Sequence, residues 1–191
     1  MTILMKKLLF VALLVAYTRG DVDPLHDFID ASDDDSGVTY RDYQAGDKMN
    51  GGPVAACDKP LRRCFVAVDT SVGPKTVIGV IETEIPDSTL DKDTGKLIRD
   101  KTPPSVKKDG EIGYIHGVAV VDAWRRRGIA TNLIDLRFKN IDDKRPEVSA
   151  LYLDVMLTNK EAIALYEKTG FVRITKDPNW LTMARYLAHS R

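Results

Sequence analysis

Three consecutive arginines stand next to a glycine in the second half of the chain, and residues of these types can bind a polyanion. The set is Arg125, Arg126, Arg127, Gly128 and Ala130. Gly128 and Ala130 carry little side chain, so a ligand can approach the backbone closely. A helix starting near Ile129 would offer its first-turn N–H groups and the positive end of its dipole at the same point. The pattern Arg-x-x-Gly-x-Ala therefore predicts a site for a di- or polyanion such as a pyrophosphate.

The segments on either side of the arginines predict a strand and a helix. Residues 113–120 form an apolar run with β-branched members, which is typical of a strand. Residues 129–142 repeat apolar side chains at helical spacing, which predicts a helix that faces the core. These side chains are Leu133, Ile134, Phe138 and Ile141. The turn itself is a weak signal, because a basic helix start is more often solvated surface and the glycine patterns of the nucleotide-binding loops are missing.

A second block with the same strand–helix order strengthens the first. Residues 151–157 predict a strand, and the motif Thr-Asn-x-x-Ala-x-x-Leu-Tyr-Glu-x-x-Gly-Phe follows it. Thr158 and Glu161 have the spacing of a capping box for a helix that runs to Lys168. Gly170 then fits the left-handed C-terminal cap of that helix.

Together the two blocks resemble the GNAT family of acetyl-CoA-dependent N-acetyltransferases, above all protein N-terminal acetyltransferases of the NatC catalytic-subunit type. The similarity extends over about residues 38–187 and is densest after residue 113. It implies an α/β fold with a central mixed sheet flanked by helices, whose fourth and fifth strands splay apart to admit the pantetheine arm. It also implies acetyl-CoA as co-substrate and no metal.

The resemblance assigns cofactor roles to two groups of residues. Val118, Ala119 and Val120 would lie along the pantetheine, with the backbone of Val118 and Val120 pairing to it as to an added strand; a plain core strand is the alternative. The pyrophosphate would be held by Arg125, Arg126, Arg127, Gly128, Ile129, Ala130 and Thr131. Asn159 and Tyr166 would line the thiol end.

The catalytic candidates come from two strands and a helix. NatC-type enzymes carry a glutamate and a tyrosine at the positions that match Asp154 and Tyr166, so Tyr166 would protonate the thiolate and Asp154 would take the ammonium proton through a water. The rival base lies on the preceding strand, where Tyr114 and His116 point to one face. A histidine titrates near neutral pH and suits this task. We rank Tyr166 first, Asp154 second, and Tyr114 and His116 after them.

Composition narrows the class of protein. The 191 residues are 43% hydrophobic, which suffices for one good core, and we expect one domain over residues 38–191. Lys plus Arg and Asp plus Glu both number 28, so the net charge predicts no nucleic-acid partner. Cys57 and Cys64 could form one bridge in an oxidising lumen, but we expect reduced surface thiols.

The first 37 residues read differently from the rest. Residues 1–20 hold two lysines, an apolar run and small residues, the parts of a secretory signal or anchor, although the apolar run could instead be a buried first strand. Residues 21–37 are acidic and predict a solvated linker. A membrane would be met only through residues 1–20 if they are retained. The compartment stays open, because the signal-like start favours secretory or organelle targeting whereas the family resemblance favours the cytoplasm.

Further elements are expected before the arginine turn. Strands are predicted at residues 38–43, 64–69 and 76–82, the last two as a hairpin around Gly73, and Asp47 could cap a short helix. Residues 85–110 predict a long mobile loop. The last two strands are expected at residues 171–175 and 181–187. The family usually has two helices between its first two strands, and their interval is short here, which puts the acceptor in doubt.

These observations favour acetyl transfer to a primary amine, with a protein N-terminus as the first candidate acceptor. A small-molecule amine or lysine acetyltransferase is the alternative within the family, and a possible auxiliary subunit comes with the NatC resemblance. A module that binds acetyl-CoA without turnover is the alternative outside it. The intact turn and Tyr166 argue against that module, since it would have no need of both.

Overall fold

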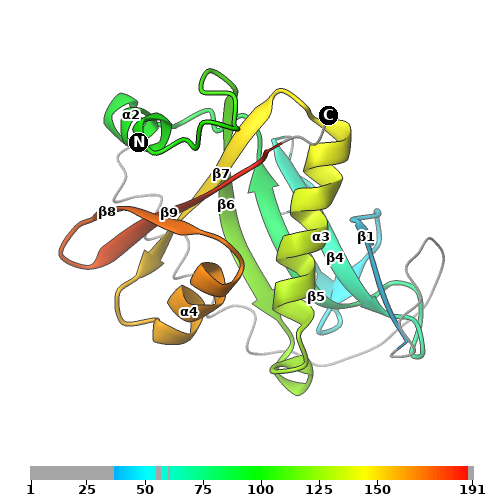
Figure 1. The fold of residues 1–191 in the computed structure, drawn as a ribbon. Helices are drawn as coiled ribbons and strands as arrows, with labels where there is room; N and C mark the ends of the chain where they lie inside the picture. The colour runs from blue at the N-terminus through cyan, green and yellow to red at the C-terminus, as the bar shows by residue number, and fades with distance from the viewer. Residues whose placement is uncertain (1–36, 55–56, 60, 189–191) are drawn as a thin grey trace. The chain divides into compact units, whose positions relative to one another are not determined.

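The structure is a computed structural model that describes residues 37–54, 57–59 and 61–188, so the predicted segment 1–20 and nearly all of the acidic linker lie outside it. Its elements follow one another along the chain in Figure 1. They are β1 (Val38–Asp42), β2 (Lys48–Met49), β3 (Gly52–Pro53), β4 (Arg62–Asp69), β5 (Thr76–Glu84), α2 (Lys92–Asp100), β6 (Glu111–Val120), the 3₁₀ turn η1 (Asp122–Trp124), α3 (Ile129–Lys144), β7 (Val148–Met156), α4 (Lys160–Lys168), β8 (Val172–Lys176) and β9 (Trp180–Tyr186).

The described chain divides into two compact units. The first contains residues 37–83 and 116–137, and the second contains residues 84–115 and 138–188, so β6 and α3 each contribute to both. Strand order in the first unit is β1-β4-β5-β6, with β2 beside β5 and β3 beside β2; in the second it is β6-β7-β9-β8. The described strands number nine and form a mixed sheet, and three α-helices accompany them, which confirms the predicted fold class.

Helix α3 packs closely on β5 in the first unit. Gly79 of β5 makes this possible, because a Cβ there would come within 2.9 Å of Leu133 and 3.0 Å of Ile129, both on α3. At the other end of this part of α3, the buried Arg137 donates to the Thr83 hydroxyl over 2.8 Å and pairs with Asp42 over 3.4 Å. The part of α3 that follows the arginine turn, residues 129–137, is therefore fixed to the sheet.

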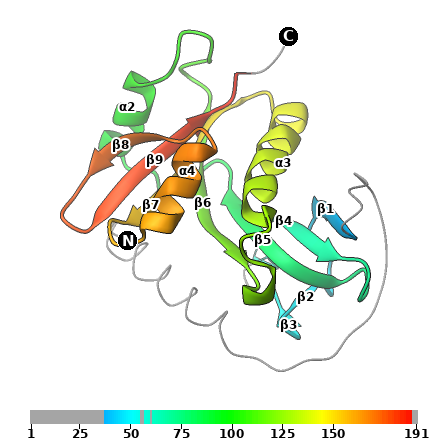
Figure 2. The same ribbon diagram turned by 60° about the horizontal axis from the view of Figure 1, so that its bottom comes forward.

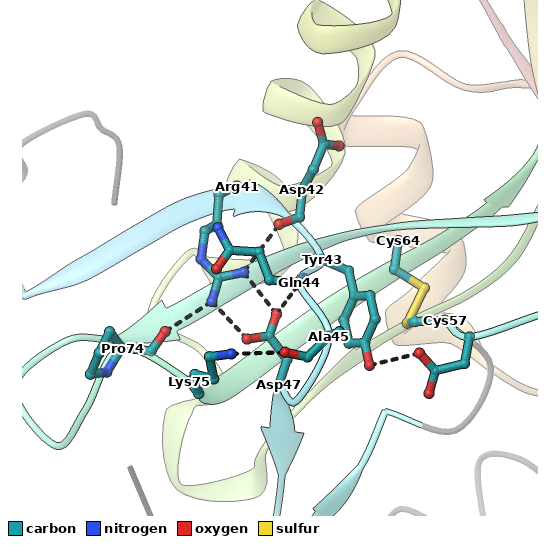
Figure 3. A network of polar contacts seen from close by, with 11 residues as sticks. Arg41, Asp42, Tyr43, Gln44, Ala45, Asp47, Cys57, Cys64, Pro74 and Lys75 are labelled. Atoms are coloured by element: carbon teal, nitrogen blue, oxygen red, sulfur yellow. Dashed lines mark hydrogen bonds and ion pairs between the residues drawn. A yellow bond between two sulfur atoms is a disulfide. The ribbon is translucent and has the colours of Figure 1, made fainter. Parts of the chain in front are cut away.

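A buried ion pair organises the interval between β1 and β4. Arg41 forms two hydrogen bonds to Asp47, of 2.7 and 2.8 Å, and a third of 2.9 Å to the Pro74 carbonyl (Figure 3). Asp47 is 1% exposed and also accepts from the Gln44 N–H. The prediction that Asp47 caps a helix is wrong, because this carboxylate neutralises Arg41, and the segment continues into the β2–β3 pair visible in Figure 2.

Cys57 and Cys64 form a disulfide, which corrects the expectation of reduced surface thiols (Figure 3). Both are buried, in a cluster with Val54, Val66 and four other buried apolar side chains of this unit. The pairing closes because β4 begins only a few residues after Cys57 and brings the two Cα atoms within 5.5 Å. Spacing alone could not reveal that approach.

In the second unit, β7 pairs in parallel with β6 and antiparallel with β9, and β9 pairs antiparallel with β8. The β6–β7 register runs from Glu111 to Tyr114 on β6. Gly113 lies at a tight point in it, since a Cβ there would meet Leu151 at 2.5 Å and the Glu84 carbonyl at 2.9 Å. The predicted last pair of strands is confirmed.

The segment between β5 and β6 contains helix α2, so the prediction of a long loop over 85–110 is wrong. Asp91 caps α2 by accepting from the N–H groups of Asp93 and Thr94. Ile98 of α2 is 1% exposed and packs in a cluster of second-unit side chains. Its carbonyl accepts from the Tyr186 hydroxyl over 2.7 Å. Buried contacts with residues distant in sequence hold α2 in place. The helix has only nine residues, one of them a central glycine, so its periodicity was too short to predict it.

Helix α4 begins one residue later than the capping-box pattern indicates. Its N-cap is Asn159, whose side-chain oxygen accepts from the Ala162 N–H over 3.1 Å, so Thr158 is not the cap. The C-terminal prediction is confirmed, because Gly170 has a φ of 84°. Among the helices of the described residues, none has the length and apolar character needed to cross a membrane.

Candidate active site

The arginine turn has a backbone suited to a closely approaching ligand. Arg126 and Gly128 both have positive φ, 60° and 83°, and α3 starts directly after them at Ile129. Among the described residues, a Cβ built on Gly128 would meet nothing within 4 Å, so the space beside this glycine is open. No acidic side chain stands in the first turn of α3. The N–H groups of that turn and the helix dipole therefore favour an anion here.

The three arginines are not equivalent. Arg125 pairs with Asp122 over 2.8 Å and donates to the Val120 carbonyl over 3.2 Å. The Arg127 guanidinium lies over the Trp124 ring, 4.9 Å from its centre. Arg126 is exposed, and the structure records no partner for its side chain among the described residues. Arg126 is thus the arginine whose charge is least committed to the protein itself.

The part of β6 that precedes this turn is more exposed than a central strand should be. Residues 112–115 are buried, whereas Val118, Ala119 and Val120 are half-buried, although they are as apolar. Ala119 packs on the cluster that contains the disulfide, and the Val121 N–H donates to the Ile78 carbonyl over 2.9 Å. This stretch is supported by β5 and by the core of the first unit.

The second unit brings together three of the four predicted catalytic residues. Tyr114 is buried, and burial raises its pKa, as do the nearby charge of Asp154 and, more weakly, the Tyr166 hydroxyl. The Asp154 N–H donates to the Tyr114 oxygen and lowers that pKa in part. Burial raises the pKa of Tyr166 to about 12. Tyr114 and Tyr166 are therefore neutral phenols at neutral pH and can donate protons.

Asp154 is the half-buried member of an otherwise buried stretch of β7. One of its carboxylate oxygens accepts from the Thr182 hydroxyl over 2.6 Å, and the two residues face each other in the β7–β9 register. Its partial exposure leaves the carboxylate within reach of water. The predicted fourth member, His116, is half-buried in the first unit.

Three residues of this cluster escaped the sequence analysis. Tyr152 lies two residues before Asp154 on β7, and alternation on a strand could have placed both on one face. Thr182 was hidden because the β7–β9 register was unknown. Asp87 lies in the segment expected to be a loop, and only the structure shows that it accepts a hydrogen bond from the Tyr152 hydroxyl over 2.6 Å.

Asn159, which is predicted to line the thiol end of the cofactor, caps a helix in the structure. Its side-chain oxygen caps α4, which leaves its amide N–H groups for other contacts. Among the residues that the structure describes, no group of three or more His, Cys, Asp or Glu side chains is arranged to hold a metal ion.

The geometry defines an α/β protein with a glycine- and arginine-containing turn at a helix start and a cluster of proton-bearing side chains. The family model for the acetyltransferase (GNAT) family matches residues 25–171. This match covers well over half of the sequence, and the chain belongs to the GNAT acetyltransferase family.

Individual relatives agree with the family over shorter stretches. N-alpha-acetyltransferase 60 of Danio rerio is 31% identical over 97 residues, which are 50% of this chain and 38% of the relative. The N-alpha-acetyltransferase of Saccharolobus solfataricus is 37% identical over 62 residues, 32% of this chain and 36% of the relative. The chain thus spans well under two thirds of the length of these curated relatives.

A solved structure agrees in fold. Arabidopsis thaliana NAA60, determined in complex with acetyl-CoA, superimposes with a TM-score of 0.59 at 18% identity, covering 78% of this chain and 98% of that one. At this identity the likeness supports the fold.

Proposed function

We propose that this protein transfers the acetyl group of acetyl-CoA to the α-amine of a protein N-terminus. The observation that carries the proposal is the gathering of Tyr114, Asp154 and Tyr166 in one unit of a GNAT chain, with a neutral phenol on two of them. The relatives named N-alpha-acetyltransferase support the acceptor.

The first unit supports acetyl-CoA as the co-substrate. The turn from Arg125 to Thr131 offers an open backbone at Gly128 and an exposed guanidinium at Arg126, for which the described residues provide no recorded partner. Charge-assisted hydrogen bonds from such groups to a pyrophosphate are stronger than neutral ones. The half-buried residues Val118 to Val120 suit an extended pantetheine, which can pair with a strand as a peptide does.

The second unit supports the proton transfers. The acceptor nitrogen attacks the thioester carbonyl carbon once its ammonium has lost a proton, which Asp154 receives through a water. The new C–N bond forms a tetrahedral intermediate, and its collapse breaks the C–S bond. Tyr166 gives its proton to the departing thiolate, and the surplus proton on the new amide nitrogen returns to the tyrosinate through water. Asp154 can act as the base because it is half-buried, and Tyr166 as the acid because it remains protonated.

The segment between β1 and β4 differs from the family pattern, which is a reason to test other acceptors. The family's two helices are absent from its described residues, which hold the β2–β3 pair and the Cys57–Cys64 disulfide instead. A different surface around the acceptor could select a lysine or a small amine. These acceptors belong in the same experiment.

The experiment measures CoA release with acetyl-CoA and four kinds of acceptor: peptides with different first residues, the same peptides with a blocked N-terminus, polyamines and arylalkylamines. We expect turnover with some unblocked peptides and none with their blocked partners. Turnover with blocked lysine-containing peptides or with amines alone would assign the alternative acceptors.

The binding-only alternative has its own signature. In that case acetyl-CoA would bind in calorimetry while no acceptor raised CoA release above the uncatalysed rate, and the proposed transfer would be wrong. The Arg63→Gln variant is the control for acetyl-CoA binding: it removes an exposed arginine of the first unit that lies outside the turn, so it should bind acetyl-CoA as the wild type does.

A further inference from the structure

Asp87 is a buried carboxylate that neither the family motifs nor the proposed proton transfers use. It lies between β5 and α2 and is 8% exposed. One carboxylate oxygen accepts from the N–H and hydroxyl of Thr89, over 2.9 and 3.0 Å, and the other accepts from the Tyr152 hydroxyl over 2.6 Å. Its own N–H donates to the Ile112 carbonyl of β6 over 2.9 Å. Both the backbone and the side chain of Asp87 are thus fixed.

The hydrogen bond to Asp87 fixes the Tyr152 ring, and Tyr152 contacts Tyr114. The two ring centres are 4.8 Å apart at an interplanar angle of 58°. The rings belong to neighbouring strands, because Tyr114 of β6 and Tyr152 of β7 face each other in the parallel register. A ring anchored at its hydroxyl limits the positions that its packed neighbour can take.

Asp87 also contributes charge to the same place. Burial is the main cause of the raised pKa of Tyr114, followed by the charges of Asp154 and Asp87. The pKa of Tyr152 is raised by burial first and then by its bond to Asp87. Both phenols are therefore protonated, and the Tyr152 hydroxyl donates a hydrogen bond to the Asp87 carboxylate.

We propose that Asp87 is a positioning residue for the reaction: it orients Tyr152, which in turn holds the Tyr114 phenol beside Asp154. The inference rests on the proposed acetyl transfer, since it gives the Tyr114–Asp154 pair a part in it. The segment between β5 and β6 would thus position the reacting groups in addition to packing against them.

Glu84 provides a matched control for Asp87. It is also 8% exposed and belongs to the same unit, three residues earlier, and its carboxylate accepts from the N–H and hydroxyl of Ser88 as that of Asp87 does from Thr89. No hydrogen bond between Glu84 and Tyr152 is recorded among the described residues. Glu84→Gln therefore perturbs a comparable carboxylate that lacks the bond to the tyrosine pair.

The experiment compares Asp87→Ala, Asp87→Asn, Tyr152→Phe and Glu84→Gln in the full chain. We expect Asp87→Ala and Tyr152→Phe to lower kcat about tenfold or more while the KM for acetyl-CoA stays within about twofold, because an orientation effect acts on the chemical step. Asp87→Asn keeps an oxygen that can accept from Tyr152, so it should restore most of kcat. Glu84→Gln should leave kcat unchanged.

A second measurement is independent of turnover. In NMR spectra of protein labelled at tyrosine ring carbons, with signals assigned by Tyr114→Phe and Tyr152→Phe, Asp87→Ala should shift the Tyr114 signal and Glu84→Gln should not. If the wild type transfers no acetyl group but the Tyr114 signal moves as expected, the proposed function fails and the orienting contact stands. An unmoved Tyr114 signal, an unchanged kcat in Asp87→Ala, or equal losses in Glu84→Gln would overturn the positioning role.

Discussion

The arginine turn and the tyrosine cluster use polar residues in opposite ways. At the turn, charged side chains are exposed, and a ligand can approach Gly128 without displacing protein atoms. In the cluster, Tyr114 and Tyr152 are 3% and 4% exposed, and their hydroxyls bond within the protein. Exposed charge suits reversible binding of an anion, while buried, fully bonded groups suit a fixed geometry for proton transfer.

Mutations should therefore separate the binding of acetyl-CoA from the chemical step. Changes at the turn act on the proposed acetyl-CoA site, so they should alter acetyl-CoA affinity. Changes in the cluster act on groups whose partners are other side chains, so they should alter the chemical step. The division also follows the two units, since the turn belongs to the first and the cluster to the second.

The largest effect is expected from Gly128→Glu. The new side chain places bulk and negative charge in the open space beside the turn, at a residue whose φ of 83° already disfavours it. Calorimetry should show acetyl-CoA affinity reduced more than about a thousandfold, or about 4 kcal/mol. Gly46→Glu is the control, because it adds the same side chain at a φ of 90° in the same unit. Equal losses in both variants would mean that the effect is not local to the turn.

Tyr166→Phe should have the next largest effect and a different signature. It removes only a hydroxyl, so we expect kcat to fall about a hundredfold, or about 2.7 kcal/mol, with acetyl-CoA affinity unchanged. Tyr186→Phe is the control, since its hydroxyl bonds to the Ile98 carbonyl in the same unit. A loss of affinity equal to the loss of rate would contradict the separation of binding from chemistry.

How well the sequence predicted each region depended on the distance over which its contacts act. The strand, turn and helix from residue 113 to 142 are set by local periodicity and by Gly128, and their predicted positions agree with β6 and α3. The core positions of that helix, Leu133 and Ile134 among them, are buried as expected. Local signals sufficed because each element presents its apolar face with its own period.

The parts that the sequence did not predict depend on which segments the fold brings together. Asp87 reaches Tyr152 across 65 residues, and α2 is held through Ile98 and Tyr186 across 88. The ion pair of Arg41 with Asp47 and the disulfide are short-range in sequence, but both form because β-strands return the chain on itself. Pairing register, which periodicity does not specify, decides these contacts.

Reducing the disulfide should destabilise the first unit without touching the tyrosine cluster. A cross-link that closes a loop of about eight residues contributes about 2.5 kcal/mol through the entropy of the unfolded chain. Urea denaturation of the wild type with and without dithiothreitol should show this loss. The Cys57→Ser/Cys64→Ser double variant should match the reduced wild type and respond to dithiothreitol no further. A wild type whose free energy of unfolding is the same in both conditions would show that the bridge contributes no stability.

The smallest effect concerns the second unit and alkaline pH. Tyr166 has a pKa of about 12 in the folded protein and about 10 when unfolded, so below pH 10 both states hold its proton. Between these values only the folded state does, and the free energy of unfolding falls by about 1.4 kcal/mol per pH unit on account of this group. Denaturation at pH 9 and pH 11 should therefore show a drop that Tyr166→Phe reduces by about 1.4 kcal/mol. Tyr43→Phe, at a half-exposed tyrosine of the first unit, should reduce it much less. If both variants reduce the drop equally, burial of Tyr166 is not its cause.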